Sequence, residues 1–174
     1  MTDLELREIL LETYEYRDGD KGWGLYWKNC SQSKKKNGIK AGYIKNNSMH
    51  GSKDYWYVAV NRRNYREHRM IFLMHHGYLP QLVDHNDNNS LNNDINNLRV
   101  GTKNQNGYNQ KLSKRNTSGY KNVFRSNNKK NPFCVRMRVD TKALYFGNYA
   151  TAEEANEVAI RERERLHGQF ANHG

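Results

Sequence analysis

The chain has 174 residues, enough for one medium domain or two small ones and too few for a large enzyme core. Lys and Arg number 29 against 18 Asp and Glu, and the formal net charge of +11 favours an anionic partner, either nucleic acid or an acidic membrane surface. The longest apolar run is far shorter than the roughly 18 residues of a membrane span, and the acidic start differs from a signal peptide. We therefore expect an intracellular protein with no membrane partner.

The charge and the cysteines divide the chain unevenly. Residues 1–20 hold seven acidic residues and two basic ones, whereas residues 101–150 hold eleven basic residues and one acidic one. The excess positive charge therefore lies mainly in the second half. Cys30 and Cys134 are far apart and have no further Cys or His at zinc-finger spacing, so we expect two free thiols.

The first half alternates between helix and strand patterns. Apolar spacing predicts helices, and β-branched and aromatic runs predict strands. The expected elements are a helix over Leu4–Thr13, strands over Leu25–Lys28, Ala41–Ile44 and Tyr55–Val60, and a helix over Tyr65–His76 that Gly77 ends. Residues 86–110 are rich in asparagine, but Leu91, Ile95, Leu98 and Val100 indicate packed structure within that segment.

The second half predicts a three-stranded sheet followed by one helix. The strands are expected over Tyr120–Arg125, Phe133–Val139 and Ala143–Tyr149, and a capping box of Thr151 and Glu154 begins a helix over Ala152–Leu166. A basic segment over residues 110–118 precedes this module. The fold class is therefore α+β, with two modules over residues 1–109 and 119–174.

Residues 83–106 read VDHNDNNSLNNDINNLRVGTKNQN. This segment resembles the HNH endonuclease family, in the branch common among phage homing endonucleases; the upstream motifs GLYWK, EHR and HHGYLP also match that branch. The resemblance implies a ββα-metal unit over about residues 80–109, in an H-N-N variant. His85 would end the first strand, Asn97 would begin the second, and Asn106 would lie on the helix. The resemblance also implies that the protein is located in the cytoplasm of a phage's host cell.

The residue types suit phosphodiester hydrolysis. His85 is our candidate general base, because an imidazole titrates near neutral pH. The Asp84 carboxylate and the Asn106 amide oxygen are hard ligands of the kind that Mg²⁺ or Mn²⁺ takes, and no organic cofactor is expected. By the resemblance, Asn97 ties the loop and orients His85. Asn88 replaces the family's usual glycine, and asparagine tolerates positive φ.

For His68 we favour packing in the core over catalysis, while Arg69 and Arg99 are candidates to approach a phosphate.

The motifs TSGYKNVFR, FCVRMR, LYFGNY and TAEEA of residues 117–155 resemble the DNA-binding domain of plant ethylene-response factors. In that family a three-stranded sheet lies in the major groove, and its exposed side chains contact bases and phosphates. Phe124 and Ser126 stand where the family has arginine. The expected DNA-binding residues, including two from the basic segment, are Lys114, Arg115, Lys121, Arg125, Arg136, Arg138 and Tyr145.

Together these patterns predict a metal-dependent DNA endonuclease that nicks or cuts double-stranded DNA, with cleavage leaving a 5′-phosphate. The C-terminal sheet and the basic segment would position the HNH unit on its target. The alternative is a non-catalytic DNA-binding regulator whose HNH unit is vestigial, and RNA as the ligand of the basic sheet also stays open.

Overall fold

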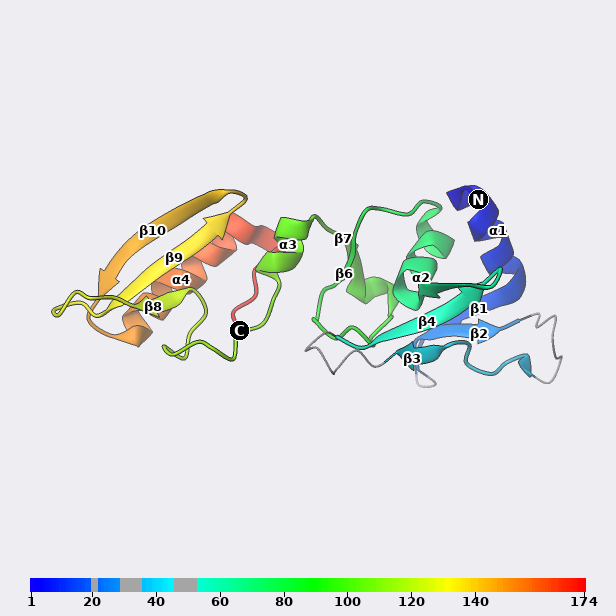
Figure 1. The fold of residues 1–174 in the computed structure, drawn as a ribbon, viewed down its shortest axis with the longest axis horizontal. Coiled ribbons are helices and arrows are strands. Elements are labelled where there is room, and N and C mark those ends of the chain that lie inside the picture. The colour runs from blue at the N-terminus through cyan, green and yellow to red at the C-terminus, as the bar shows by residue number, and fades with distance from the viewer. Residues whose placement is uncertain (20–21, 29–35, 46–52) are drawn as a thin grey trace. The chain divides into compact units, whose positions relative to one another are not determined.

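A computed structural model describes residues 1–19, 22–28, 36–45 and 53–174, and Cys30 lies outside this part of the chain. The chain divides into two compact units, Met1–Val100 and Gly101–Gly174, which Figure 1 shows in blue to green and in green to red. Helices and strands occur in both, so the predicted mixture of helix and sheet is confirmed.

The first unit begins with α1 (Asp3–Thr13), whose N-terminus is closed by a capping box of Thr2 and Glu5. The strand β1 (Tyr14–Arg17) follows at once and pairs antiparallel with β2 (Gly24–Trp27). A second antiparallel sheet has the order β3-β4-β5, formed by Tyr43–Lys45, Tyr55–Val60 and Arg63–Arg66.

The helix α2 (Glu67–His76) follows β5 directly and ends at Gly77, whose φ is 77°. The predicted start of this helix at Tyr65 was wrong, because Tyr65 and Arg66 pair with Val58 and Tyr57 of β4 and so belong to a strand. Side chains all around α2 are buried, and with α1 and the two sheets it forms the core of the unit. The fully buried apolar members of this core are Leu10, Leu25, Ala41, Val58, Ile71 and Leu73.

The first part of the asparagine-rich segment, residues 86–97, lies between two short strands. The antiparallel pair β6 (Val83–His85) and β7 (Leu98–Val100) aligns Asp84 with Arg99, and the 3-10 turn η3 (Ile95–Asn97) precedes β7. Leu98 is buried and Ile95 half-buried, as expected, but Leu91 and Val100 are exposed. The expected packing was wrong for these two side chains, since Leu91 lies in the turn region and Val100 at the end of the sheet.

The second unit begins with α3 (Lys103–Tyr108), which a capping box of Thr102 and Gln105 starts. An antiparallel sheet follows in the order β10-β9-β8, formed by Lys142–Tyr149, Phe133–Val139 and Val123–Arg125. The helix α4 (Ala152–His167) packs on this sheet and leads into the turn η4 (Gly168–Phe170). The predicted strand of residues 133–139 and the capping box of Thr151 and Glu154 are confirmed.

The first strand of this sheet is shorter than predicted. It begins at Val123 instead of Tyr120 because residues 116–122 form a turn. The side chains of Asn116 and Ser118 bond to the backbone oxygens of Tyr120 and Val123, and Asn122 has a positive φ of 68°. These local bonds replace the ladder bonds that a longer strand would make.

The helix α3 belongs to the second compact unit, whereas the sequence motifs place it in a first module that runs to residue 109. The Tyr108 ring stacks on His167 at 3.9 Å, and Lys121 Nζ donates to the Tyr108 carbonyl at 2.8 Å. These contacts account for the division after Val100. Within the described ranges, no helix combines the length and the apolar character needed to cross a bilayer.

Candidate active site

The site is built around the end of β6, where Asp84 and His85 are both buried, at 6% and 5% exposure. The paired strand β7 presents Arg99 to Asp84, and Arg99 Nη2 lies 3.2 Å from Asp84 Oδ2. Arg99 also donates to Asn86 Oδ1 at 2.5 Å. This arginine, which the sequence suggested for a phosphate, therefore holds the carboxylate beside the candidate base.

His85 is connected to α2 by one buried amide. His85 Nε2 lies 3.0 Å from Asn93 Oδ1, and Asn93 Nδ2 donates to Glu67 Oε2 at 2.6 Å. Asn93 is 1% exposed and Glu67 is fully buried. Sequence reasoning missed both residues.

Glu67 has further partners in β2 and in the segment that precedes β3. Its Oε1 accepts from the Leu25 amide at 2.9 Å and lies 3.5 Å from Lys40 Nζ. Burial raises the pKa of Glu67, whereas Lys40 and the hydrogen bonds from Leu25 and Asn93 act to lower it. The buried carboxyl group is therefore partly compensated by Lys40 and by these hydrogen bonds.

Two aromatic side chains cover the other sides of His85. The His68 ring centroid is 4.7 Å from that of His85, and Tyr55 lies 5.5 Å from His68 and 6.2 Å from His85. His68 is 3% exposed, as the packing interpretation predicted. Burial places the pKa of His68 well below its ordinary value, and the neighbouring His85 acts in the same direction.

The protonation of His85 follows from the same surroundings. Burial lowers its pKa, while the hydrogen bond with Asn93 and the carboxylates of Asp87 and Asp84 act to raise it. The imidazole is thus neutral at neutral pH, which is the state that can accept a proton from water.

Asn97 closes the asparagine-rich loop with three hydrogen bonds. Its Oδ1 accepts from the Asp87 amide at 3.0 Å, and its Nδ2 donates to Asp87 Oδ1 and to the Asn92 carbonyl, each at 2.9 Å. Asn88 has a positive φ of 61°, which is the conformation expected where the family has glycine. The loop between β6 and β7 is thereby held by local side-chain bonds.

Two further predicted residues lie outside the β6–β7 pair. Asn106 lies half-buried on α3 in the second unit. Arg69 donates to the carbonyls of Pro80 and Gln81 and so holds the segment after α2. Throughout the described ranges, no cluster of three or more His, Cys, Asp or Glu side chains is suited to hold a metal ion.

The donors at β6 still fit a hard divalent cation. Mg²⁺ keeps several waters and binds proteins through one or two carboxylates together with substrate phosphates. Asp84 supplies one buried carboxylate next to His85, and Arg99 bonds to one of its two oxygens. A one-carboxylate site of this kind is compatible with Mg²⁺ or Mn²⁺ chemistry and unlike a structural zinc site.

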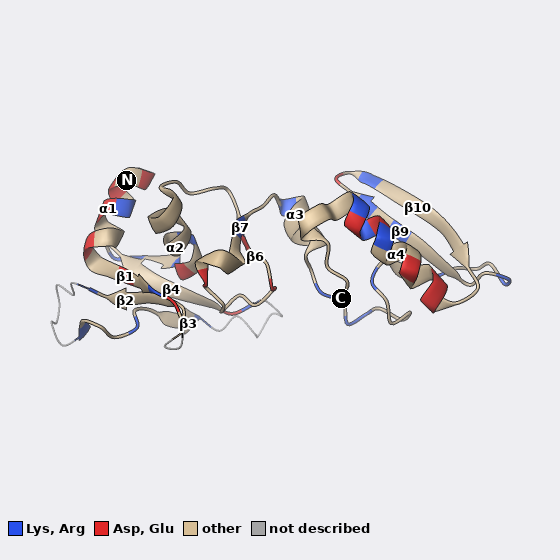
Figure 2. Cartoon of the chain, turned by 180° about the vertical axis from the view of Figure 1, so that it is seen from behind, with Lys and Arg blue, Asp and Glu red and all other residues tan. Residues whose placement is uncertain are grey.

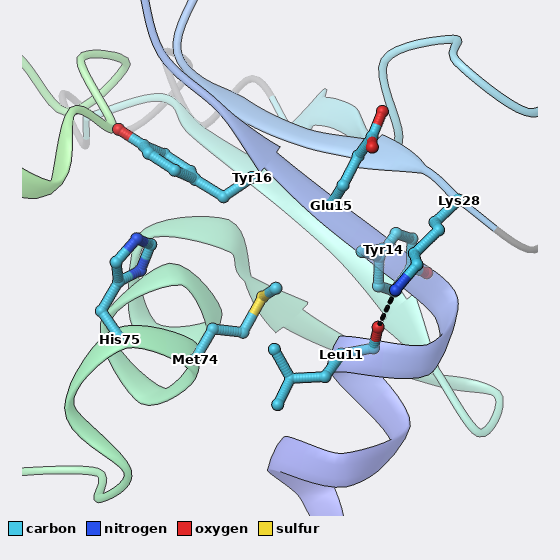
Figure 3. A pocket seen from close by; sticks show the side chains of 7 residues that line it. All are labelled: Leu11, Tyr14, Glu15, Tyr16, Lys28, Met74 and His75. Atoms are coloured by element: carbon cyan, nitrogen blue, oxygen red, sulfur yellow. Dashed lines mark hydrogen bonds between the residues drawn. The ribbon is translucent and has the colours of Figure 1, made fainter.

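A hollow in the first unit lies beside α1 and α2, and His85 is not among the residues that line it (Figure 3). It measures about 360 Å³, and Tyr16 and His75, which line it, meet edge to face at 4.8 Å. The Tyr16 hydroxyl accepts from the Ile95 amide at 3.0 Å and so ties β1 to η3. This hollow holds no buried Asp–His pair, and we place the candidate site at β6.

The second unit exposes a set of the predicted DNA-binding side chains on one sheet face. Tyr145 pairs with Arg136, and Ala143 pairs with Arg138, so these side chains lie on the same face of β9 and β10. Both arginines are exposed, and Tyr145 is 58% exposed. Phe124, in register with Cys134, adds an exposed ring to this face. We call Phe124, Arg136, Arg138 and Tyr145 the exposed sheet face.

Arg125 and Lys121 are placed elsewhere. Arg125 pairs with Phe133, in register with the strand positions that pack on α4, and its guanidinium lies over the Phe133 ring at 5.1 Å. Lys121 Nζ bonds to the carbonyls of Tyr108 and Gln110. Lys114 and Arg115 are exposed before β8. Figure 2 shows acidic and basic residues interspersed along α4, on the other side of this sheet.

The sequence contains a faint signal for one of the two missed residues. Glu67 stands at helical spacing with Met70, Ile71 and Met74, on a face that is otherwise apolar, so a buried partner for it could have been sought. Asn93 gives no such signal, since it is one of many asparagines in its segment.

Residues 65–108 match the sequence pattern of the family described as HNH endonuclease. Protein 3.8 of Escherichia phage T7 is 33% identical over 110 residues, which cover 61% of this chain and 88% of that protein. An uncharacterized HNH endonuclease of Acanthamoeba polyphaga mimivirus is 32% identical over 130 residues, which cover 69% of this chain and 66% of that protein. No solved structure matches. With a buried Asp–His pair at the end of β6 inside the matching segment, the chain carries an HNH endonuclease domain.

Proposed function

We propose that the protein is a metal-dependent endonuclease that hydrolyses phosphodiester bonds in double-stranded DNA. The observation that carries this proposal is the buried pair of Asp84 and a neutral His85 at the end of β6. The family match over residues 65–108 supports the same chemistry.

His85 would take the proton of the attacking water, since a neutral imidazole within reach of that water is a competent base. Asp84 would hold a divalent cation, Mg²⁺ or Mn²⁺, and the Asn106 amide is its second ligand by the sequence motif. When bound, such a cation stabilises the charge that develops on the leaving oxygen. Arg99 orients Asp84 through their ion pair.

The exposed sheet face would position the nuclease on its target. Arginine side chains read guanine edges or neutralise phosphates, and Arg136 and Arg138 lie in the open beside two exposed rings. Lys114 and Arg115 would add phosphate contacts, whereas Lys121 and Arg125 are the weaker candidates because both are engaged within the unit. The chain would thus combine a nuclease unit with a unit that reads DNA, and it has two viral relatives. Both features support a phage homing endonuclease that acts in the host cytoplasm.

The test is a plasmid relaxation assay with and without EDTA. We expect nicked or linear product only when Mg²⁺ or Mn²⁺ is present, and restoration of cleavage when the cation is returned after chelation. DNA binding without cleavage under any divalent cation would instead favour the non-catalytic regulator. Sequencing of the product ends would show whether a 5′-phosphate is left and whether one or both strands are cut.

A further inference from the structure

We propose that Glu67 and Asn93 are positioning residues that fix the tautomer of His85, with the proton on Nε2 and the lone pair on Nδ1. This inference rests on the proposed function only in giving Nδ1 the role of the base. The tautomer itself is a property of the folded chain and is measured without DNA.

The first step concerns the orientation of the Asn93 amide. An ionised carboxylate can only accept hydrogen bonds, and Glu67 Oε2 lies 2.6 Å from the side chain of Asn93. Asn93 must therefore turn its NH₂ group toward Glu67 and its carbonyl oxygen toward His85. An amide oxygen only accepts, so His85 Nε2, 3.0 Å away, is the donor.

The second step concerns the charge on Glu67. This side chain is fully buried, and an uncompensated carboxylate there would be costly. Its Oε1 meets the Leu25 amide at 2.9 Å and the Lys40 ammonium at 3.5 Å. Lys40 is held in turn by the Trp23 carbonyl at 2.8 Å and lies over the Trp56 ring at 4.5 Å. Lys40, the cation that compensates Glu67, is thus held in place by contacts within the first unit.

The backbone at Gly24 lies very close to the ion pair of Glu67 and Lys40. A Cβ atom at this position would lie 1.9 Å from Lys40 Nζ and 2.9 Å from Glu67 Oε1, and the residue has a φ of 144°. Only glycine allows β2 to pass so close to the ion pair. A continuous path of polar contacts therefore runs from Lys40 through Glu67 and Asn93 to His85.

The variant Glu67→Gln turns this path into a discriminating experiment. The Leu25 amide and the Lys40 ammonium both require an oxygen at the Oε1 position, so the new NH₂ group would occupy the Oε2 position. Because Asn93 then faces the NH₂ donor of the new glutamine, its side-chain amide must flip and present its own NH₂ group to His85. Nε2 then has to accept, and the proton moves to Nδ1. Glu67→Gln is nearly isosteric and lies two hydrogen bonds away from His85. We expect it to reverse the tautomer of His85.

The measurement is the long-range ¹H–¹⁵N correlation spectrum of the imidazole groups in the ¹⁵N-labelled full chain at mildly alkaline pH, with His85→Ala used to assign the signals. We expect the Nε2–H form in the wild type and the Nδ1–H form in Glu67→Gln. Glu8→Gln is the matched control, because Glu8 is exposed on α1, and it should leave the spectrum as in the wild type.

Cleavage is measured in parallel. Residues that fix a catalytic tautomer are worth up to about 10⁴-fold in rate, so Glu67→Gln should lose cleavage by at least about 10²-fold while it keeps DNA affinity and its circular dichroism spectrum. An Nδ1–H form in the wild type, or an unchanged tautomer in folded Glu67→Gln, would overturn the proposal.

A second variant covers the case in which Glu67→Gln does not fold. Asn93→Ala removes the amide and leaves the charge pair of Glu67 and Lys40 intact, and it should release His85 into exchange between both tautomers with a loss of cleavage of about 10–100-fold. A His85 tautomer that stays fixed in this variant would contradict the positioning role. A wild type that shows the expected tautomer but cuts no DNA would refute the proposed function alone.

Discussion

The two compact units present their polar residues in opposite ways. In the first unit Asp84, His85, Asn93 and Glu67 are buried, and Asn93 bonds to both His85 and Glu67, whereas in the second unit Arg136, Arg138 and Tyr145 are exposed. Burial sets protonation states and tautomers, which proton transfer requires. Exposure keeps cations available to a polyanion in water. The difference therefore agrees with the proposed division, in which the first unit cuts DNA and the second unit holds it.

The largest expected effect is on cleavage, and it comes from a change among the buried residues of the first unit. His85→Ala removes the proposed base, and general base catalysis contributes about 10²–10⁴-fold. Cleavage in the plasmid assay should fall by that factor, while affinity for DNA in an anisotropy titration stays unchanged. His76→Ala, which truncates an exposed histidine of the same unit, is the control and should cut normally. Normal cleavage by His85→Ala would remove His85 from the mechanism.

The exposed side of the comparison is tested by replacing Arg136 and Arg138 together with alanine. If both contact DNA, affinity should fall at least about tenfold, and the slope of log K against log salt should become shallower by about 2. Anisotropy with duplex DNA at several salt concentrations measures both. Duplex RNA in the same titration tests the alternative nucleic acid.

Arg125→Ala is the matched control for this experiment. The sequence motif places Arg125 among the DNA contacts, but its register with Phe133 puts it on the side of the sheet that packs on α4. We expect little change in affinity. A loss as large as that of the double variant would mean that the exposed sheet face is not the DNA-binding surface.

The features that the sequence predicted well are those that depend on local pattern. The alternation of residues 133–139 and the capping box at Thr151 predicted β9 and the start of α4 correctly. The position of His85 at the end of a strand also followed from a short motif. Such elements are predictable because the alternation lies within one run of residues and the capping box within four consecutive residues.

The features that it could not predict depend on contacts between distant residues. Asn93 meets Glu67 across 26 residues, and the side of the sheet on which Arg125 lies depends on its register with Phe133. The shorter β8 results from side-chain bonds of Asn116 and Ser118 that compete with the strand. Patterns along one segment contain no information about such partners.

A smaller effect is expected on acid stability, and it also distinguishes the units. Burial lowers the pKa of His68 well below its ordinary value, and His85, Arg66 and Arg69 oppose its charged form. The unfolded chain then binds more protons than the folded one below a pH of about 6.5, so stability is lost as the pH falls through that value. Urea midpoints from about pH 7 to about pH 5 should show this loss for the first unit.

The variant His68→Phe should flatten this dependence, because it removes the proton uptake of the unfolded state at that position. Glu67 contributes with the opposite sign, since its pKa is raised, and the difference between wild type and variant isolates His68. In the second unit, burial together with Lys121 and Arg163 lowers the pKa of the buried His167. We therefore expect the urea midpoint of that unit to depend more weakly on pH. An equal slope in wild type and His68→Phe would contradict the neutral His68.

The smallest expected effect concerns the helix that supports the exposed sheet face. Thr151 accepts a hydrogen bond from the Glu154 amide and starts α4, and loss of such a cap costs about 0.5–2 kcal/mol. Thr151→Ala should therefore lower the urea midpoint of the second unit and leave that of the first unchanged, with Thr141→Ala in the exposed turn as control. Because α4 packs on β9 behind the exposed face, DNA affinity should weaken only near the unfolding transition. Cleavage lost by Thr151→Ala under conditions where the second unit is folded would show that the two units do not divide the work as proposed.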